Sequence, residues 1–481
     1  MGRALLVTGA LSVPGMATAM TARAATAAVP AAAAVGYVVP PTPIAAPSLL
    51  DTRCRSMVSK SSYYFSTYWW KTRQRYPASG IPVIRLGSER EASNVAITMA
   101  VTADWHGYLP SAVRLDLADV RLRAAKLVIG VARRHRVNTT GPSWGHTWQS
   151  AYWAYACGLA GWLLWNSQLT NKVDRAAVAA MVVDEADFQL TRHWPEFWLH
   201  TENDALYPVS GAYTDGPHSR AGDSAMEENL WNATVLSLAG AMMPGHPSAA
   251  AWRSRAAQFT ITGLVRKADA LDEVTAVNGR SIQNWCADAA PAGSGYNLPY
   301  DYVVVNHGKC SPDYMQASFI PLTCAIHNAL ANVPTPEAHR YNAKRVYGAM
   351  RTVLYVVPGV GTRAMYASTS SPTLYFPCGV DWGMARHAGY WAWDSLVDTM
   401  VFGGTDSVVP VAAGTWDRVH GNAAIAMQNR AGVMPGGQIV LRPVEDSYPG
   451  REGWHASNAA FVVLNKLVTN AGRVSWTNDA L

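Results

Sequence analysis

The feature that most constrains the fold of this chain is an apolar pattern of helical period that recurs from about residue 48 to the C-terminal end. Apolar residues return every three or four positions, as on the buried face of an α-helix, and strand-like alternation is sparse. The pattern appears near residues 48–75, 90–106, 112–136, 146–166, 174–193, 224–243, 249–271, 313–331, 337–355, 387–402, 415–429 and 454–469. About twelve segments carry it, so the sequence predicts an all-α protein.

Short and long connections alternate between these predicted helices. The short ones hold turn residues, as at 244–247 and 334–336, whereas stretches rich in Gly, Pro and Tyr occupy 194–223, 272–312 and 357–386. Helices joined in this way suit six helical hairpins closed into a ring, an (α/α)6-type toroid whose long loops gather at one mouth. An irregular helical protein or a solenoid is the alternative, although the chain has no clean internal repeat of the kind a solenoid needs.

The first 47 residues differ from the rest. An early arginine, an apolar stretch from Ala4 to about Met20 and small residues around Ala22 predict a secretory signal peptide, followed by an Ala/Val/Pro-rich disordered leader. Residues 48–481 are then expected to form one toroid domain of a secreted protein. No later segment has the roughly 20 uncharged apolar residues that a membrane span needs, so no membrane partner is expected.

Composition argues against several kinds of partner. The formal charge of +6 includes Arg3 and Arg23, which signal cleavage would remove, leaving 6 − 2 = +4. The chain lacks the clusters of Lys and Arg interleaved with aromatic residues that nucleic-acid binding requires, so no nucleic-acid partner is expected. No glycine-rich phosphate loop follows a strand, so no nucleotide, flavin or haem cofactor is expected. We expect a monomer.

Six cysteines can form three disulfides in an exported protein. Their spacings match no zinc pattern, so no metal is expected. Cys286 and Cys310 flank one long loop and are the preferred pair, although sequence alone does not determine connectivity.

An amide, an imidazole, a carboxylate and a phenol fall together at residues 305–314, before an apolar helix. Asn306 can hold a carboxyl or hydroxyl group, His307 can take a proton near neutral pH, and Tyr314 can return one to a leaving oxygen. These are the groups that breaking a glycosidic bond by elimination requires. The alternative is a polar loop in which Asp313 caps the next helix and Tyr314 only packs.

Two further segments hold candidate site residues. Trp144, Trp148 and Gln149 stand before a Trp-rich helix and can form a sugar subsite, because indole rings stack on sugars; helix initiation with core aromatics is the alternative. The whole chain has nineteen Trp and twenty-one Tyr against eight Phe. Because Trp and Tyr combine an apolar ring with a hydrogen-bonding group, this composition favours a partly solvated carbohydrate-binding cleft.

In the second segment, Glu228 and Asn232 are four residues apart on one helix and can face the same point of a cavity. Glu227 is the other candidate, because adjacent helical residues diverge and only one of the two glutamates is expected to face inward.

A last segment runs from 378 to 394. Arg386 can clamp a carboxylate through its bidentate fork, Trp382 can stack on a sugar, and Asp381 can contact the substrate. An ion pair of Arg386 with Asp381 or Asp394 is the alternative.

Together these segments resemble the secreted (α/α)-toroid polysaccharide lyases, broadly the alginate, chondroitin and heparinase II/III-like groups. The resemblance implies that Asn306 neutralises a uronate carboxylate, His307 removes the C5 proton, Tyr314 protonates the leaving oxygen and Arg386 assists. It implies a secreted enzyme that cleaves an acidic polysaccharide. The larger lyases add a C-terminal β-sandwich, whereas this chain ends with its last predicted helix and would be a toroid-only member.

Two other functions stay open. An inverting glycoside hydrolase on the same scaffold would use two facing carboxylates, Glu227 or Glu228 with Asp313 or Asp381. A non-catalytic glycan-binding protein would need only the aromatic residues. A lyase requires Asn306, His307 and Tyr314 around one cleft, so the arrangement in space decides among the three.

Overall fold

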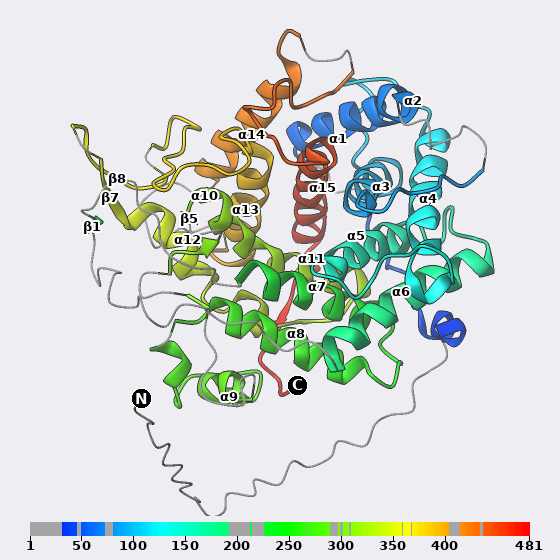
Figure 1. The fold of residues 1–481 in the computed structure, drawn as a ribbon, viewed down its shortest axis with the longest axis horizontal. Coiled ribbons are helices and arrows are strands. Elements are labelled where there is room, and N and C mark those ends of the chain that lie inside the picture. The colour runs from blue at the N-terminus through cyan, green and yellow to red at the C-terminus, as the bar shows by residue number, and fades with distance from the viewer. Residues whose placement is uncertain are drawn as a thin grey trace, which may run out of the picture.

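Six helices form an inner ring, and six others pack around the outside of it (Figure 1). This computed structural model describes residues 31–45, 50–72, 80–191, 212–213, 226–266, 268–288, 297–298, 302–306, 309–357, 359–366, 368–403, 414–432 and 436–481. The inner helices are α3 (Glu89–Asp104), α5 (Ser150–Leu163), α7 (Met226–Met242), α11 (Thr323–Ala331), α13 (His387–Met400) and α15 (Arg451–Asn470). The outer helices are α1 (Thr52–Tyr64), α4 (Leu117–Arg133), α6 (Lys172–Thr191), α8 (Ala249–Leu264), α12 (Ala343–Thr352) and α14 (Thr415–Asn429).

The inner ring closes on itself. Helix α3 packs against α5, α5 against α7, and α7 against α11 and the short helix η6 (Gln316–Leu322) that precedes it. Helix η6 then contacts α13, α13 contacts α15, and α15 returns to α3. Outer and inner helices alternate along the chain, as α3, α4, α5, α6, α7 and α8 illustrate. The predicted all-α toroid is therefore confirmed.

Burial explains which helices lie inside. Helix α5 is apolar or small on every side, and all its residues except Trp153 are buried, as expected for a helix surrounded by others. Outer helix α4 instead buries one stripe, including Val120, Ala124 and Leu127, while Leu122 on its other side is 40% exposed. Each of the twelve predicted helical segments overlaps one of these helices.

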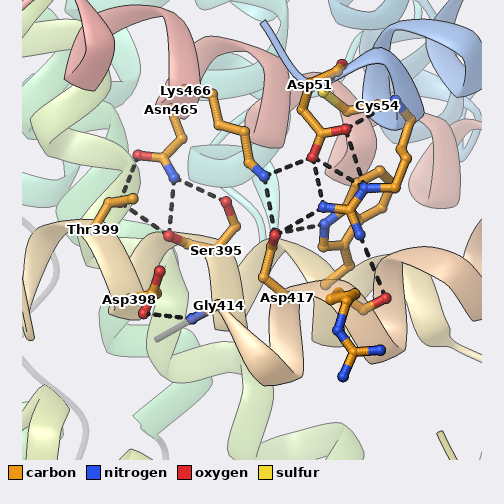
Figure 2. Close-up of polar contacts among 12 residues, drawn as sticks. Asp51, Cys54, Ser395, Asp398, Thr399, Gly414, Asp417, Asn465 and Lys466 are labelled. Atoms are coloured by element: carbon orange, nitrogen blue, oxygen red, sulfur yellow. Dashed lines mark hydrogen bonds and ion pairs between the residues drawn. The ribbon is translucent and has the colours of Figure 1, made fainter. Parts of the chain in front are cut away.

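A cluster of charged groups links the first helix, α1, to the last two helices, α14 and α15 (Figure 2). Asp51 caps α1, and Lys466 of α15 donates from Nζ to Asp51 Oδ2 at 2.8 Å and to Asp417 Oδ2 of α14 at 3.0 Å. The Nη2 atom of Arg53 lies 3.0 Å from the same Asp417 oxygen. Burial opposes ionisation of Asp51, but Arg53 and Lys466 outweigh it and hold its pKa well below the usual range. The first and last helices are thus held together by alternating charges.

The connections hold more structure than the sequence predicts. Strand β7 (Leu354–Val357) pairs with both β1 (Ala212–Tyr213) and β8 (Gly361–Arg363). A second small sheet pairs β6 (Thr335–Pro336) with β9 (Trp476–Thr477). The expected loop at 272–312 contains the hairpins β2–β3 (Ala276–Val277, Arg280–Ser281) and β4–β5 (Val305–Asn306, Lys309–Cys310), and the helix α9 (Ile282–Ala287). The other short helices are η1 (Ala31–Tyr37), η2 (Phe65–Trp69), α2 (Trp70–Thr72), η3 (Arg136–Asn138), η5 (Asp269–Leu271), α10 (Pro312–Met315) and η7 (Glu337–Arg340). A separate small core that includes Ile261 and Trp285 anchors α9 to α8.

Part of the expected leader is folded onto the ring. Helix η1 packs against α6, the Val39 amide donates to the Met242 carbonyl at 2.8 Å, and the Trp162 indole donates to the Val39 carbonyl at 2.7 Å. Residues 31–45 are therefore not a disordered leader, and the expected boundary near residue 47 is wrong for this stretch. Within the described residues, no helix combines the length and the apolar character needed to cross a bilayer.

Candidate functional site

A narrow cavity, with about 40 Å³ open to the centres of water molecules, lies where the N-terminal ends of the inner helices converge. It is lined by Arg90, Tyr152, Glu227, Trp231, Asp313, Gln316, Ala317, Phe319, Ile320, Arg386 and Trp454. All but one of the inner helices contribute a residue from, or just before, their first turns, and α10 with η6 supplies the wall that leads into α11. Helix N-termini carry partial positive charge, so this arrangement favours an anionic group in the cavity.

Arg386, just before α13, is held by two carboxylates. Its Nη1 atom lies 2.9 Å from Asp313 Oδ2 and its Nε atom 3.3 Å from Asp446 Oδ2, while its guanidinium stacks 3.9 Å from the Trp454 ring centre. Burial would lower the pKa of Arg386, but the charges of Asp313 and Asp446 outweigh burial and raise it. The alternative partners expected from sequence, Asp381 and Asp394, are therefore wrong. With both carboxylates in place, Arg386 is not an open clamp for a substrate.

Asp313 is fixed from several sides. Besides Arg386, Gln316 donates from Nε2 to Asp313 Oδ1 at 3.0 Å and the Tyr390 hydroxyl donates to the same oxygen at 3.4 Å. Burial raises the pKa of Asp313 above its usual value, although the charge of Arg386 and the hydrogen bond from Tyr390 oppose this rise. Gly389 makes room for this arrangement, because a Cβ there would lie 2.0 Å from the Gln316 side-chain oxygen.

Glu227, the second residue of α7, faces the cavity. Asn306 on β4 donates from Nδ2 to Glu227 Oε2 at 2.9 Å, which orients the carboxyl group. The neighbouring Glu228 is buried and is not one of the described residues that line the cavity, and the same holds for Asn232. Of the two adjacent glutamates, Glu227 is therefore the one available to a substrate.

Tyr314 and Asp381 form a second pair beside this one. The Tyr314 hydroxyl donates to Asp381 Oδ2, and Lys309 forms an ion pair with the same carboxylate. Burial and the adjacent Asp381 charge raise the pKa of Tyr314, so its phenol stays protonated and donates a hydrogen bond. His307 lies outside the described residues.

The aromatic candidates separate into two groups. Trp148 is 62% exposed and packs edge-on against the cavity residue Trp231, with ring centres 5.6 Å apart. Trp382 packs edge-on against Tyr448 at 5.0 Å, and Tyr448 contacts Arg386 in turn. Trp144 is buried and its indole donates to the Val131 carbonyl, so it belongs to the core and the expected sugar contact at Trp144 is wrong.

Several cavity residues were not predicted from sequence. Arg90, Tyr152, Trp231, Gln316 and Trp454 lie within helical apolar patterns and look like ordinary helix residues. One signal was present, because Arg90 is the second residue of α3, where a positive charge opposes the helix dipole. Gln149, which was predicted, accepts a hydrogen bond from Arg90 Nη1 at 3.0 Å. In the described part of the chain, no group of His, Cys, Asp and Glu side chains is arranged to hold a metal ion.

The six cysteines, all within the described residues, form no disulfide bond with one another, and the two that lie close together are not the pair expected from the sequence. Cys310 Sγ lies 2.9 Å from Cys378 Sγ, whereas Cys286 is buried in the small core beneath α9. Cys286 is therefore the wrong partner for Cys310. Burial raises the pKa of the Cys54, Cys286 and Cys324 thiols to about 12, which makes them poor nucleophiles.

Oxidised glutathione is expected to convert Cys310 and Cys378 into a disulfide, with release of two reduced glutathione molecules by thiol exchange. The bond would tie hairpin β4–β5 to the loop that carries Asp381. Mass spectrometry of a non-reduced digest should find this cross-link, and a Cys378→Ser variant should lack it. A cross-link between Cys310 and Cys286 in the native protein would contradict this pairing.

Comparison with known proteins does not assign the chain to a family. No protein-family model matches it, and no curated protein matches it. One similar solved structure is a mutant of unsaturated glucuronyl hydrolase from Streptococcus agalactiae, with 9% sequence identity, a TM-score of 0.40, and coverage of 89% of this chain and 98% of that chain. Similarity at this level does not transfer an activity, so the function rests on the site itself.

Proposed function

We propose that this protein is a carbohydrate-active enzyme that hydrolyses a glycosidic bond of an acidic saccharide. The observation that carries the proposal is that Glu227 and Asp313, from different helices, line one cavity together with aromatic side chains. Two carboxylates across a cleft are what glycosidic hydrolysis requires, one to protonate the leaving oxygen and one to act on the other face of the sugar. Tyr152, Trp231 and Trp454 are the aromatic side chains in this lining, and aromatic rings are common in sugar-binding sites.

The surroundings of the two carboxyl groups suggest different roles. Asp313 receives hydrogen bonds from Gln316 and Tyr390 and pairs with Arg386. Burial raises its pKa, but the paired guanidinium stabilises the carboxylate form. Asp313 therefore serves as the anionic partner that activates water. Glu227, oriented by Asn306, is the group that gives its proton to the departing oxygen.

Elimination is the second candidate. Asn306 and Tyr314, which the resemblance to polysaccharide lyases implies as catalytic residues, contact Glu227 and Asp381 beside the cavity. Neither is among the described residues that line it, and Arg386 is bound by carboxylates. Hydrolysis is therefore favoured over elimination.

A panel of acidic and neutral polysaccharides tests the proposal. Polygalacturonate, alginate, hyaluronan, starch and cellulose would each be assayed in parallel for new reducing ends and for the ultraviolet absorbance of an unsaturated product. Hydrolysis of an acidic polymer gives reducing ends without that absorbance. Reducing ends with the absorbance would identify a lyase, and binding without either signal would identify a glycan-binding protein; both outcomes would overturn the proposed hydrolysis.

A further inference from the structure

The cavity contains a second arginine whose surroundings differ from those of Arg386. Arg90 lines the cavity from the first turn of α3, and its guanidinium carbon lies 5.0 Å from the ring centre of Tyr152, 5.8 Å from that of Trp231 and 4.8 Å from that of Tyr448. Three aromatic rings thus hold the guanidinium by cation–π contacts. The position of the charge is fixed by these rings.

The hydrogen bonds of Arg90 leave one edge of the guanidinium unused. Its Nη1 atom donates to Gln149 Oε1 and to the Tyr448 hydroxyl. Its Nε atom is buried and has no acceptor among the described residues. No carboxylate in the described part of the chain forms an ion pair with Arg90, whereas Arg386 across the same cavity binds two. The Nε and Nη2 edge is the fork that binds a carboxylate in a bidentate manner.

We propose that Arg90 binds the carboxylate of a hexuronate residue of the substrate and so determines specificity for acidic sugars. The inference rests on the proposed function and adds the group that selects the substrate. Arg90 forms no direct ion pair with a described carboxylate, and the helix N-termini around the cavity carry partial positive charge. Tyr152 and Trp231 line the cavity beside the guanidinium.

Binding measurements on the full chain test this without requiring turnover. Isothermal titration calorimetry would compare D-glucuronate with D-glucose, and D-galacturonate with D-galactose, up to about 50 mM at pH 7. The unaltered protein is expected to bind at least one uronate about tenfold more tightly than the matching neutral sugar. Arg90→Gln should reduce that ratio to below about threefold, and Arg90→Lys should restore part of it, because lysine keeps the charge but not the fork.

Arg175 provides a matched control. It also stacks on an indole, Trp165, at 5.1 Å, and it donates to the carbonyls of Leu169 and Trp165, but it does not line the cavity. Arg175→Gln should therefore keep the uronate preference. Thermal unfolding of each variant would show whether Arg90→Gln remains folded. If it does not, the uronate preference of Arg90→Lys is compared with that of the unaltered protein instead.

The outcomes separate this inference from the proposed function. If neither uronate binds more tightly than its neutral counterpart, or if folded Arg90 variants keep the preference, Arg90 does not select acidic sugars. If Glu227→Gln keeps the uronate preference while no polysaccharide is cleaved by the unaltered protein, the Arg90 site stands and the proposed hydrolysis fails. If a polymer is hydrolysed and Arg90→Gln leaves KM and kcat unchanged, the hydrolysis stands and the Arg90 site fails.

Discussion

Replacing Glu227 with glutamine is expected to lower kcat on a cleaved polysaccharide by about 10²–10⁴, the usual size of a lost general acid. Glutamine keeps the shape of the side chain and the acceptor that Asn306 contacts at 2.9 Å, but it has no proton to give to a leaving oxygen. KM should change little, because the aromatic walls and Arg90 remain. Initial rates of reducing-end release, with circular dichroism to verify folding, would measure the effect.

The adjacent Glu228 is the matched control for this substitution. It is buried and is not one of the described residues that line the cavity, so Glu228→Gln should change kcat by less than about threefold. A large loss at Glu228 with none at Glu227 would mean that the wrong glutamate has been assigned. Full activity in both variants, with loss in Tyr314→Phe and an unsaturated product, would establish elimination instead.

Replacing Arg386 with glutamine is expected to lower the free energy of unfolding by about 3–5 kcal/mol, because it leaves two buried carboxylates without their cation. Asp313 and Asp446 both lie within 3.3 Å of the guanidinium, and both side chains are buried. The loss would also remove the stacking on Trp454. Urea denaturation followed by tryptophan fluorescence would give the difference between the two proteins.

The Arg340–Glu337 pair provides the comparison, since both of its side chains are partly exposed to solvent. Arg340→Gln should cost at most about 1 kcal/mol, as is usual for surface ion pairs. If Arg386→Gln were as stable as Arg340→Gln and instead weakened uronate binding, Arg386 would be the substrate clamp that its position in the sequence suggested. If Arg386→Gln had only small effects on stability and on uronate binding, Arg386 would be neither a structural ion-pair partner nor a substrate clamp.

The architecture was predictable because it depends on local patterns. The inner helix α5 is apolar or small on every side and the outer helix α4 buries an apolar stripe, and such patterns repeat with the helical period within one segment. The short helix α9 and the two-residue strands were missed, because elements of that length carry too few residues to show a period. Residues 31–45 do not form the expected disordered leader, because contacts with distant segments hold them in place. One such contact is the hydrogen bond from the Trp162 indole to the Val39 carbonyl, which no local pattern reveals.

The candidate site was only partly predictable. The segments rich in polar and aromatic residues include Glu227, Asp313 and Arg386, and the structure places these three around one cavity. Arg90 gave only a weak signal, since a single arginine in a first turn has many explanations.

By itself, the sequence determined that the chain is mainly helical and where its twelve long helices lie, since the energetics of a helix depend on neighbours three and four residues away. Only the tertiary structure decided that Glu227 rather than Glu228 faces the cavity and that Asp446 rather than Asp381 holds Arg386. It also decided that Cys378 rather than Cys286 lies beside Cys310. These outcomes depend on the rotation of each helix about its axis and on which distant segments of the chain come into contact. Both are set by packing among residues separated by tens to hundreds of positions, and no local pattern encodes them.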